Sequence, residues 1–492
     1  MQLTVLAQPV VNITKSGNKL GLHIANLSVT EEKSRVVRIT IRSDSGTSSF
    51  LAKASEWVCI PSRIRSTLGI KDGQVVRVVE VKTIQPHSPR PLTIVGNTVD
   101  VLSLIPTTTS RGYRLYADCY EDLEPRLRIW YYHERGAARQ IELKRYVNIG
   151  ILGGLLGQLQ AEGEKKENLV SFKNCTIHEH ADFVSGLLEL GLVLEDVHAR
   201  CVFNPRKMTS KSIRDYAEKY VGSTGVEISS FDRTPSMKGS IAADTFVRSG
   251  VLGSILSSLM NKVRSGLIGH EGLSTPFLAK ILTGDGSLDV RKTSKRLDVR
   301  VKIVDRVHEY LQDYAHLLQK EGFRPKVRLE VITVRSYCTW LNLLRLYEIG
   351  AFRNSRNWNK LLCAIAIGIK GRENSSYSRV QDLSVLSTFT SREVSCRYYI
   401  GRRAANLWLQ TMRKLGLIQV VARLNDDHFI RYGLTEKGEK MVRLLESAGR
   451  DFSRLCEEKL IFDPERLLEA SKTKSKGTRL RESSTEQSSQ TC

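Results

Sequence analysis

The stretch LAKILTGDGSL, residues 278 to 288, predicts the fold of the central part of this chain. Its leucine, alanine and isoleucine side chains form an apolar helical surface, and Gly284 lacks the side chain that would hold a second helix at a distance. Gly286 is predicted to end the helix in the left-handed conformation that is common just past a helix C-terminus. Asp285 would then lie at the negative end of the helix dipole, where a carboxylate is unfavourable unless a cation is bound nearby.

A related stretch, LLGQLQAEGE, occurs earlier at residues 155 to 164. Three leucines supply the apolar surface, Gly153, Gly154 and Gly157 supply the small positions, and Glu162 stands before Gly163 as Asp285 stands before Gly286. The second stretch therefore has the same pattern as the first.

The elements predicted after each acid also match in order. Each acid is followed by strand, helix and strand patterns and then by an apolar closing helix. These patterns lie at 169–174, 180–192, 198–205 and 246–262 after Glu162, and at 287–303 (two strands), 307–323, 326–336 and 343–352 after Asp285. We interpret this as an internal duplication.

Two such helices, packed glycine against glycine, would bring Glu162 and Asp285 together. Two carboxylates at two negative helix ends repel one another, and a divalent cation relieves that repulsion. A few hard oxygen ligands suit Mg²⁺, which keeps the rest of its shell for water and phosphate oxygens.

This pair of helices resembles the LAGLIDADG family of homing endonucleases. Residues 278–286 match the helix signature well, and residues 155–163 match it more loosely, with Glu162 in place of Asp. The likeness covers nearly half the chain. It implies two αββαββα repeats related by a pseudo-two-fold axis, with their sheets forming a saddle over double-stranded DNA.

The resemblance further implies metal-dependent cleavage of both DNA strands. Glu162 and Asp285 would be the catalytic metal ligands, with Mg²⁺ as the cofactor. Arg335, and less distinctly Lys238 in the first repeat, would be the basic residues that polarise solvent. The side chains expected to hold the DNA backbone are Lys173, Arg291, Lys292, Lys295, Arg296, Arg300 and Lys302.

Residues 371–450 predict a different unit. Three helical patterns precede two strands around an Asn-Asp-Asp turn, and this order resembles the MarR-type winged helix-turn-helix family. In the third helix Ala405, Leu409 and Met412 are spaced to face the core, with a Gly416 cap after it. The other face carries donors suited to phosphates and base edges: Arg402, Arg403, Asn406, Gln410 and Arg413. A solvated basic helix in a protein-protein contact is the alternative.

Residues 1–140 read mainly as strands. Within them WVCIPSRIRSTLGIKDGQVVRVVEV, residues 57–81, predicts strand, short helix, Gly69 stop, turn and strand, and it resembles the AbrB-like swapped-hairpin DNA-binding family. The match departs at Gln74, where an acid is usual, and any glycine-capped β-helix-β unit gives a similar pattern. Such modules usually pair with another copy, so a dimer is possible through this module, whereas a monomer suffices for the core.

Composition points to a polyanionic partner. The 492 residues include 75 Lys plus Arg against 52 Asp plus Glu, a net charge of +23. No apolar run is long enough to span a bilayer, and the N-terminus lacks a signal-peptide pattern. Nine cysteines without a C-x-x-C pair fit a reducing environment. We therefore expect a cytoplasmic location, and the basic charge adds the expectation that the protein is associated with DNA.

The sequence thus predicts a multidomain α+β protein. Its expected parts are a β-rich module at 1–140, repeats at 141–272 and 273–370, a winged helix at 371–450 and a disordered tail at 471–492. The expected function is site-specific double-strand DNA cleavage, without a membrane or small-molecule substrate. The alternatives are a transcriptional regulator with an inactive core and, third, an RNA-processing factor that would prefer single-stranded RNA.

Overall fold

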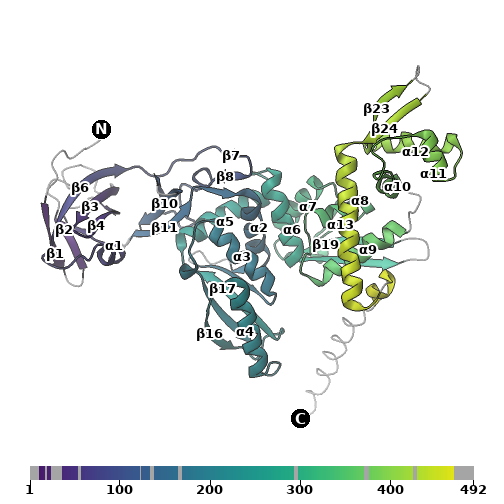
Figure 1. Cartoon of the computed structure of the whole chain (residues 1–492). Coiled ribbons are helices and arrows are strands. Elements are labelled where there is room, and N and C mark those ends of the chain that lie inside the picture. The colour runs from purple at the N-terminus through teal and green to yellow at the C-terminus, as the bar shows by residue number, and fades with distance from the viewer. Residues whose placement is uncertain are drawn as a thin grey trace, which may run out of the picture.

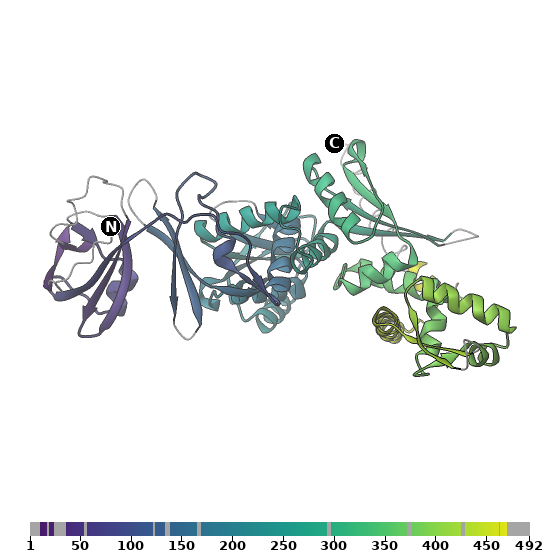
Figure 2. The ribbon, with the colours of Figure 1, turned by 90° about the horizontal axis from the view of Figure 1, so that it is seen from above.

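The computed structural model describes residues 10–16, 19–23, 36–53, 57–121, 124–132, 138–164, 169–292, 297–370, 376–424, 429–461 and 463–469. It is a mixed α+β protein in which several separate sheets follow one another along the chain (Figure 1). The order of parts along the molecule is the order in the sequence, as the view from above also shows (Figure 2).

The N-terminal part is a six-stranded sheet with the order β4-β3-β6-β1-β2-β5. Its strands are β1 (Val10–Ser16), β2 (Lys19–His23), β3 (Val36–Ser43), β4 (Gly46–Lys53), β5 (Trp57–Cys59) and β6 (Val75–Ile84). The predicted strand-helix-strand order at 57–81 is present, with α1 (Ser62–Thr67) ending before Gly69 in the left-handed conformation. Ile13, Ile39 and Phe50 belong to the buried core of this part.

Short strands connect this module to the central helices. β9 (Tyr116–Glu121), β10 (Pro125–Tyr132) and β11 (Ala138–Lys144) form one antiparallel sheet. β7 (Ile94–Val95), β8 (Thr98–Asp100) and β12 (Tyr146–Asn148) form another. Their apolar side chains join the same core as the helices that follow.

The first central unit begins with α2 (Ile149–Glu162) and ends with α5 (Gly250–Arg264). Between them lie β13 (Gly163–Glu164), β14 (Val170–Asn174), α3 (Ile177–Glu189), β15 (His198–Phe203), α4 (Ser210–Thr224), β16 (Ile228–Arg233) and β17 (Ile241–Val247). The sheet order is β13-β14-β17-β15-β16.

The second central unit begins with α6 (Glu271–Gly284) and ends with α8 (Trp340–Glu348). Between them lie β18 (Gly286–Lys292), β19 (Leu297–Val304), α7 (His308–Lys320), β20 (Pro325–Arg328) and β21 (Thr333–Tyr337). The sheet order is β18-β19-β21-β20. Across both sheets, the first and second strands of the unit are followed by its last strand and then by its third. In the first unit β16 adds one more strand at the edge.

Two details of these units differ from the sequence expectation. The pattern at 326–336 was predicted as one strand, but Leu329–Val331 form a 3-10 turn and Ile332 is left-handed, so the segment folds back as the hairpin of β20 and β21. No glycine, proline or asparagine marks this turn. In the first unit β13, β17 and the insertion of α4 and β16 were not predicted either.

The C-terminal part holds α9 (Arg356–Lys370), α10 (Ser376–Leu383), α11 (Ser391–Arg397), α12 (Arg402–Lys414) and the long α13 (Glu436–Lys459). β22 (Phe389–Thr390), β23 (Ile418–Leu424) and β24 (Phe429–Leu434) form a small antiparallel sheet. Gly416 is left-handed just after α12, as predicted for a cap. The predicted tail at 471–492 lies outside the described residues.

Candidate active site and nucleic-acid interface

Two helices, α2 and α6, pack together so closely that side chains are excluded between them. A Cβ added to Gly153 would lie 2.4 Å from the Leu273 carbonyl oxygen, and one added to Gly157 would lie 2.4 Å from the Phe277 carbonyl oxygen. The glycines of α2 therefore meet the backbone of α6, rather than its glycines as predicted. Near the ends, a Cβ on Gly284 would lie 2.7 Å from the Ala161 Cβ. Since these contacts advance along both helices, the helices are parallel and end together.

Gly163 and Gly286 follow the two helices in the same geometry. A Cβ at Gly163 would lie 2.4 Å from the Leu159 carbonyl oxygen, and one at Gly286 would lie 2.2 Å from the Leu282 carbonyl oxygen. The prediction that Gly286 is left-handed is wrong, because it starts strand β18 with ordinary backbone angles. Glycine is needed there because the chain turns into a strand against its own last helical turn.

The two acids lie at these neighbouring helix ends. Glu162 is the last residue of α2, and its Oε1 would be 3.6 Å from a Cβ on Gly284, the residue before Asp285. Asp285 is the C-cap of α6. Both side chains are half-buried.

Glu162 borders a small acidic cavity of about 190 Å³. Burial, together with the Glu179 carboxylate on α3, raises the pKa of Glu162. Glu179 is itself buried: its Oε2 accepts hydrogen bonds from Gln158 Nε2 at 2.9 Å and from Lys280 Nζ at 2.8 Å. Lys280 also donates to Asp182 at 2.7 Å, so carboxylates outnumber cations around this cavity.

Asp285 has different surroundings. The pKa of the nearby Tyr314 hydroxyl is raised by burial first, then by the Asp305 carboxylate, and then by the charge of Asp285. That hydroxyl accepts from Gln160 Nε2 at 3.0 Å and donates to Asp305 Oδ2 at 2.9 Å. Arg264 donates to Gln160 Oε1 at 3.1 Å, and this chain of hydrogen bonds connects α2, α5 and α7 beneath the end of α6.

These residues fit a hard divalent cation. Burial and the neighbouring Glu179 raise the pKa of Glu162, and the Glu179 Oε1 is buried without a hydrogen-bond partner among the described residues, so a bound cation would stabilise both carboxylates. No cluster of three or more His, Cys, Asp or Glu side chains in the described ranges could hold a metal alone. A cation here would therefore complete its shell with water or ligand oxygens, as Mg²⁺ commonly does.

The second unit presents a basic sheet face beside Asp285. Ser287, two residues after Asp285, is paired across the sheet with Lys302, then Arg335, then Lys326. Strands lie about 4.8 Å apart, so Arg335 is about 10 Å from Ser287. The opposite face carries the buried Val299, Val301, Ile303 and Val334. Basic side chains predominate over Asp289 and Asp298 on the polar face; they are Arg291, Arg300, Lys302, Lys326, Arg328 and Arg335.

The first unit does not repeat this basic row. There the matching row runs from Glu164 through Ser171 and Phe246 to His198. Phe246 thus occupies the place of Arg335, and the Arg248 guanidinium lies 5.5 Å from its ring centroid. Lys238, predicted as the counterpart of Arg335, is exposed in the loop before β17 and does not border the Glu162 cavity.

The remaining predicted DNA contacts have mixed outcomes. Lys173 is exposed in a row with Asp244 and Arg200, whose guanidinium donates to Asp244 Oδ2 at 2.9 Å. Lys295, Arg296 and the Lys292 side chain lie outside the described residues. Lys326 and Arg328 were missed, because reading 326–336 as one strand hid the β20–β21 hairpin, which places Lys326 opposite Arg335 and Arg328 opposite Thr333.

Helix α12 has the two faces expected from its spacing. Ala405, Leu409 and Met412 are fully buried. The opposite side is exposed and carries Arg402, Arg403, Asn406, Gln410 and Arg413.

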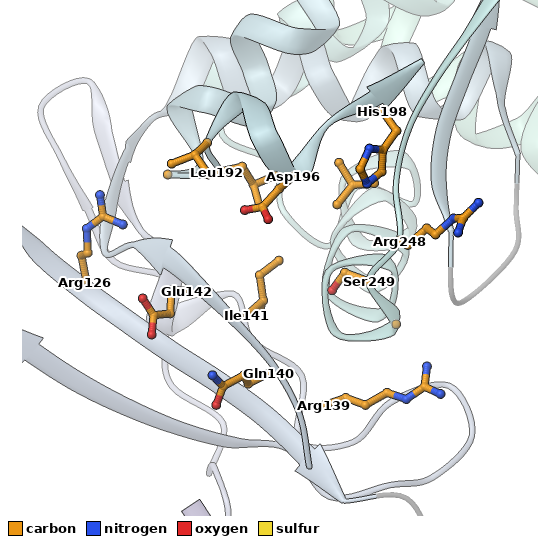
Figure 3. A pocket seen from close by; sticks show the side chains of 14 residues that line it. Arg126, Arg139, Gln140, Ile141, Glu142, Leu192, Asp196, His198, Arg248 and Ser249 are labelled. Atoms are coloured by element: carbon orange, nitrogen blue, oxygen red, sulfur yellow. The ribbon is translucent and has the colours of Figure 1, made fainter. Parts of the chain in front are cut away.

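A larger basic cavity, about 410 Å³, lies between β10, β11 and the first central unit (Figure 3). Arg126 on β10, Arg139 on β11 and Arg248 between β17 and α5 line it, and none of the three forms an ion pair with a described carboxylate. The N-terminus of α5, capped by the Ser249 hydroxyl, opens on the same space. Glu142 and Asp196 also border it, and Glu142 is paired with Arg128 at 3.0 Å.

No protein-family model matches this sequence, and no curated protein sequence matches it significantly. Within the described residues no helix is long and apolar enough to cross a membrane.

Proposed function

We propose that this protein binds double-stranded DNA and cleaves it at a long defined site, as an endonuclease of the LAGLIDADG type that needs a divalent cation. One observation carries the proposal: two parallel, glycine-packed helices end with Glu162 and Asp285 at neighbouring positions. Two carboxylates at negative helix ends destabilise the fold unless a cation is bound, so a role in cation binding explains their presence better than a role in stability.

The sheets support the same proposal. Each helix leads into a sheet with the same strand order, as a duplicated αββαββα core requires. The polar face of the second sheet is basic, and the face of the first carries Lys173 and Arg200. Such faces suit two successive stretches of DNA backbone, whose phosphates bind Lys and Arg without regard to base sequence.

The residues would divide the reaction between them. Glu162 and Asp285 would each hold a divalent cation such as Mg²⁺, and the bound cations would activate water and stabilise charge on the phosphate oxygens. Arg335, with its Nε buried and unpartnered among the described residues, would donate to a phosphate near Asp285. Lys302 and Lys326 beside it would hold the adjoining backbone.

Cleavage of a randomised duplex library tests the proposal directly. The full-length protein is expected to cut a long defined site with Mg²⁺ and to bind that site without cutting when Ca²⁺ replaces Mg²⁺. Tight, salt-sensitive binding with no cut under either ion would show that the core binds DNA without acting on it.

A second candidate function is transcriptional regulation by an inactive core. The exposed polar face of α12, beside the small sheet of β22, β23 and β24, favours it, because that arrangement suits insertion of α12 into a major groove. The strand-helix-strand unit at β5, α1 and β6 is a second feature expected of a regulator.

Sequence selection is expected to depend on α12 under either function. Replacing Arg403 and Gln410 by Ala should relax base preference at two positions, by about 1–3 kcal/mol for each lost base contact. Selection of binding sites from a random pool would measure this. The exposed Leu407→Ala variant on the same helix is the control and should keep the native preference. Unchanged base preference in the double variant would exclude α12 from base reading.

The basic cavity of Figure 3 is expected to hold phosphates of flanking DNA. The variant Arg126→Gln, Arg139→Gln, Arg248→Gln should weaken binding equally for all sequences. The slope of log K against log salt should fall by about 0.9 for each lost phosphate contact. The matched control is Arg443→Gln, Arg450→Gln, Arg454→Gln, which removes the same charge from exposed positions on α13. An equal loss in both triple variants would show a general charge effect only.

A further inference from the structure

The two halves of the acidic site are unequal. The glycine after Glu162 pairs with Phe172, and α3 starts five residues after Phe172. The glycine after Asp285 pairs with Ile303, and α7 starts five residues after Ile303, so α3 and α7 start at equivalent points. The third residue of α3 is Glu179, and the third residue of α7 is Tyr310. The second carboxylate beside Glu162 therefore has no equivalent on α7 beside Asp285.

Glu179 has a feature that a purely structural ion pair does not explain. Only 5% of the residue is exposed, and it borders the cavity that Glu162 borders. Its Oε2 accepts hydrogen bonds from Gln158 and Lys280, while its Oε1 is buried with no partner among the described residues. A buried carboxylate oxygen without a partner is costly, and such an atom commonly marks the site of a missing ligand.

Lys280 does not supply that missing partner. Its ammonium group is shared between Glu179 Oε2 and Asp182, at 2.8 and 2.7 Å. Two carboxylates, Glu162 and Glu179, therefore border the cavity, and the one ammonium group that borders it is shared with Asp182 outside the cavity, so a bound cation would stabilise both carboxylates.

We propose that Glu179 is a second protein ligand for a divalent cation at Glu162, so that the first unit binds the cation more tightly than Asp285 does in the second. This inference rests on the proposed cation site, but it does not require that DNA be cut. In the second unit Asp285 would be the one carboxylate ligand, because the nearby Asp305 already accepts hydrogen bonds from the Tyr314 hydroxyl and the Val307 backbone N–H. As the cation concentration rises, the site at Glu162 and Glu179 is therefore occupied before the site at Asp285.

Mn²⁺ titration of the full-length protein, with free Mn²⁺ followed by electron paramagnetic resonance, tests this without any cleavage reaction. Glu179→Gln should weaken the tighter Mn²⁺ site at least tenfold. Asp285→Asn should leave that site within twofold of native. Lys280→Gln, which removes the competing ammonium group, should tighten it.

Asp182→Asn is the matched control. It removes the same unit charge from the other partner of Lys280, but Asp182 does not border the Glu162 cavity and should change Mn²⁺ affinity less than twofold. Equal weakening in Asp182→Asn and Glu179→Gln, or unchanged binding in a folded Glu179→Gln protein, overturns the inference. If Mn²⁺ binding depends on Glu179 but the protein cuts no DNA, the endonuclease proposal is overturned and this inference stands.

Discussion

Asp285→Asn and Glu162→Gln are each expected to abolish DNA cleavage while leaving DNA affinity within about twofold. Each change keeps the shape of the side chain but removes the charge that holds the proposed cation. Removing a directly acting charged group at such a site commonly costs on the order of 10²–10³-fold in rate. Single-turnover cleavage of the selected duplex in Mg²⁺, beside a binding titration in Ca²⁺, measures both quantities.

Asp289→Asn is the control for these variants. Asp289 lies on β18 four residues after Asp285 and is exposed on the polar face of the same sheet. Its loss removes the same charge without touching the helix ends, so cleavage should persist and DNA affinity should rise slightly. Native-like cleavage by Asp285→Asn or Glu162→Gln would exclude these acids from the reaction.

Gly157→Ala is expected to have the largest effect on stability. Its new Cβ would lie 2.4 Å from the Phe277 carbonyl oxygen and 2.8 Å from the Lys280 Cβ, so α2 and α6 must separate along their length. Overpacking of a tight core typically costs about 1–3 kcal/mol, and a clash with backbone belongs at the upper end or beyond it. Calorimetry should show a lower transition temperature for the central units.

Gly154→Ala is the matched control in the same helix. No heavy atom lies within 4 Å of a Cβ at Gly154, so the added methyl should stabilise the helix by up to about 1 kcal/mol. Similar stability of the two variants would mean that α2 and α6 do not pack closely in solution. Separation of the helices would also move Glu162 away from Asp285, so Gly157→Ala should lose cleavage.

Part of the candidate site could be predicted from the sequence. The glycine spacing and the acid at each helix end identified Glu162 and Asp285 as neighbours because both signals are local. Glu179 could not be found this way, since it stands in the sequence between two histidines, of which His180 is buried against Thr245 and Asn174. Its role depends on contacts with Gln158 and Lys280, and Lys280 is about a hundred residues away in the chain.

The same distinction applies to the basic surface. Arg300 and Lys302, which were expected to hold the DNA backbone, lie on the face of β19 that points away from the core. The turn at Ile332 could not be predicted, and it alone brings Lys326 opposite Arg335. Lys238 was expected to match Arg335, yet register places Phe246 there, because pairing between strands decides which residues are equivalent.

The sequence by itself determined the two apolar helices that each lead into strands, the two faces of α12 and the position of an acid at each of two helix ends. These features follow from periodicity and from single glycines, which act over a few residues. Only the tertiary structure decided that the two halves differ: Glu179 beside Glu162, Tyr314 beside Asp285, and a basic row on one sheet alone. Those differences arise where distant segments pack, and no local pattern in the chain specifies which segments meet.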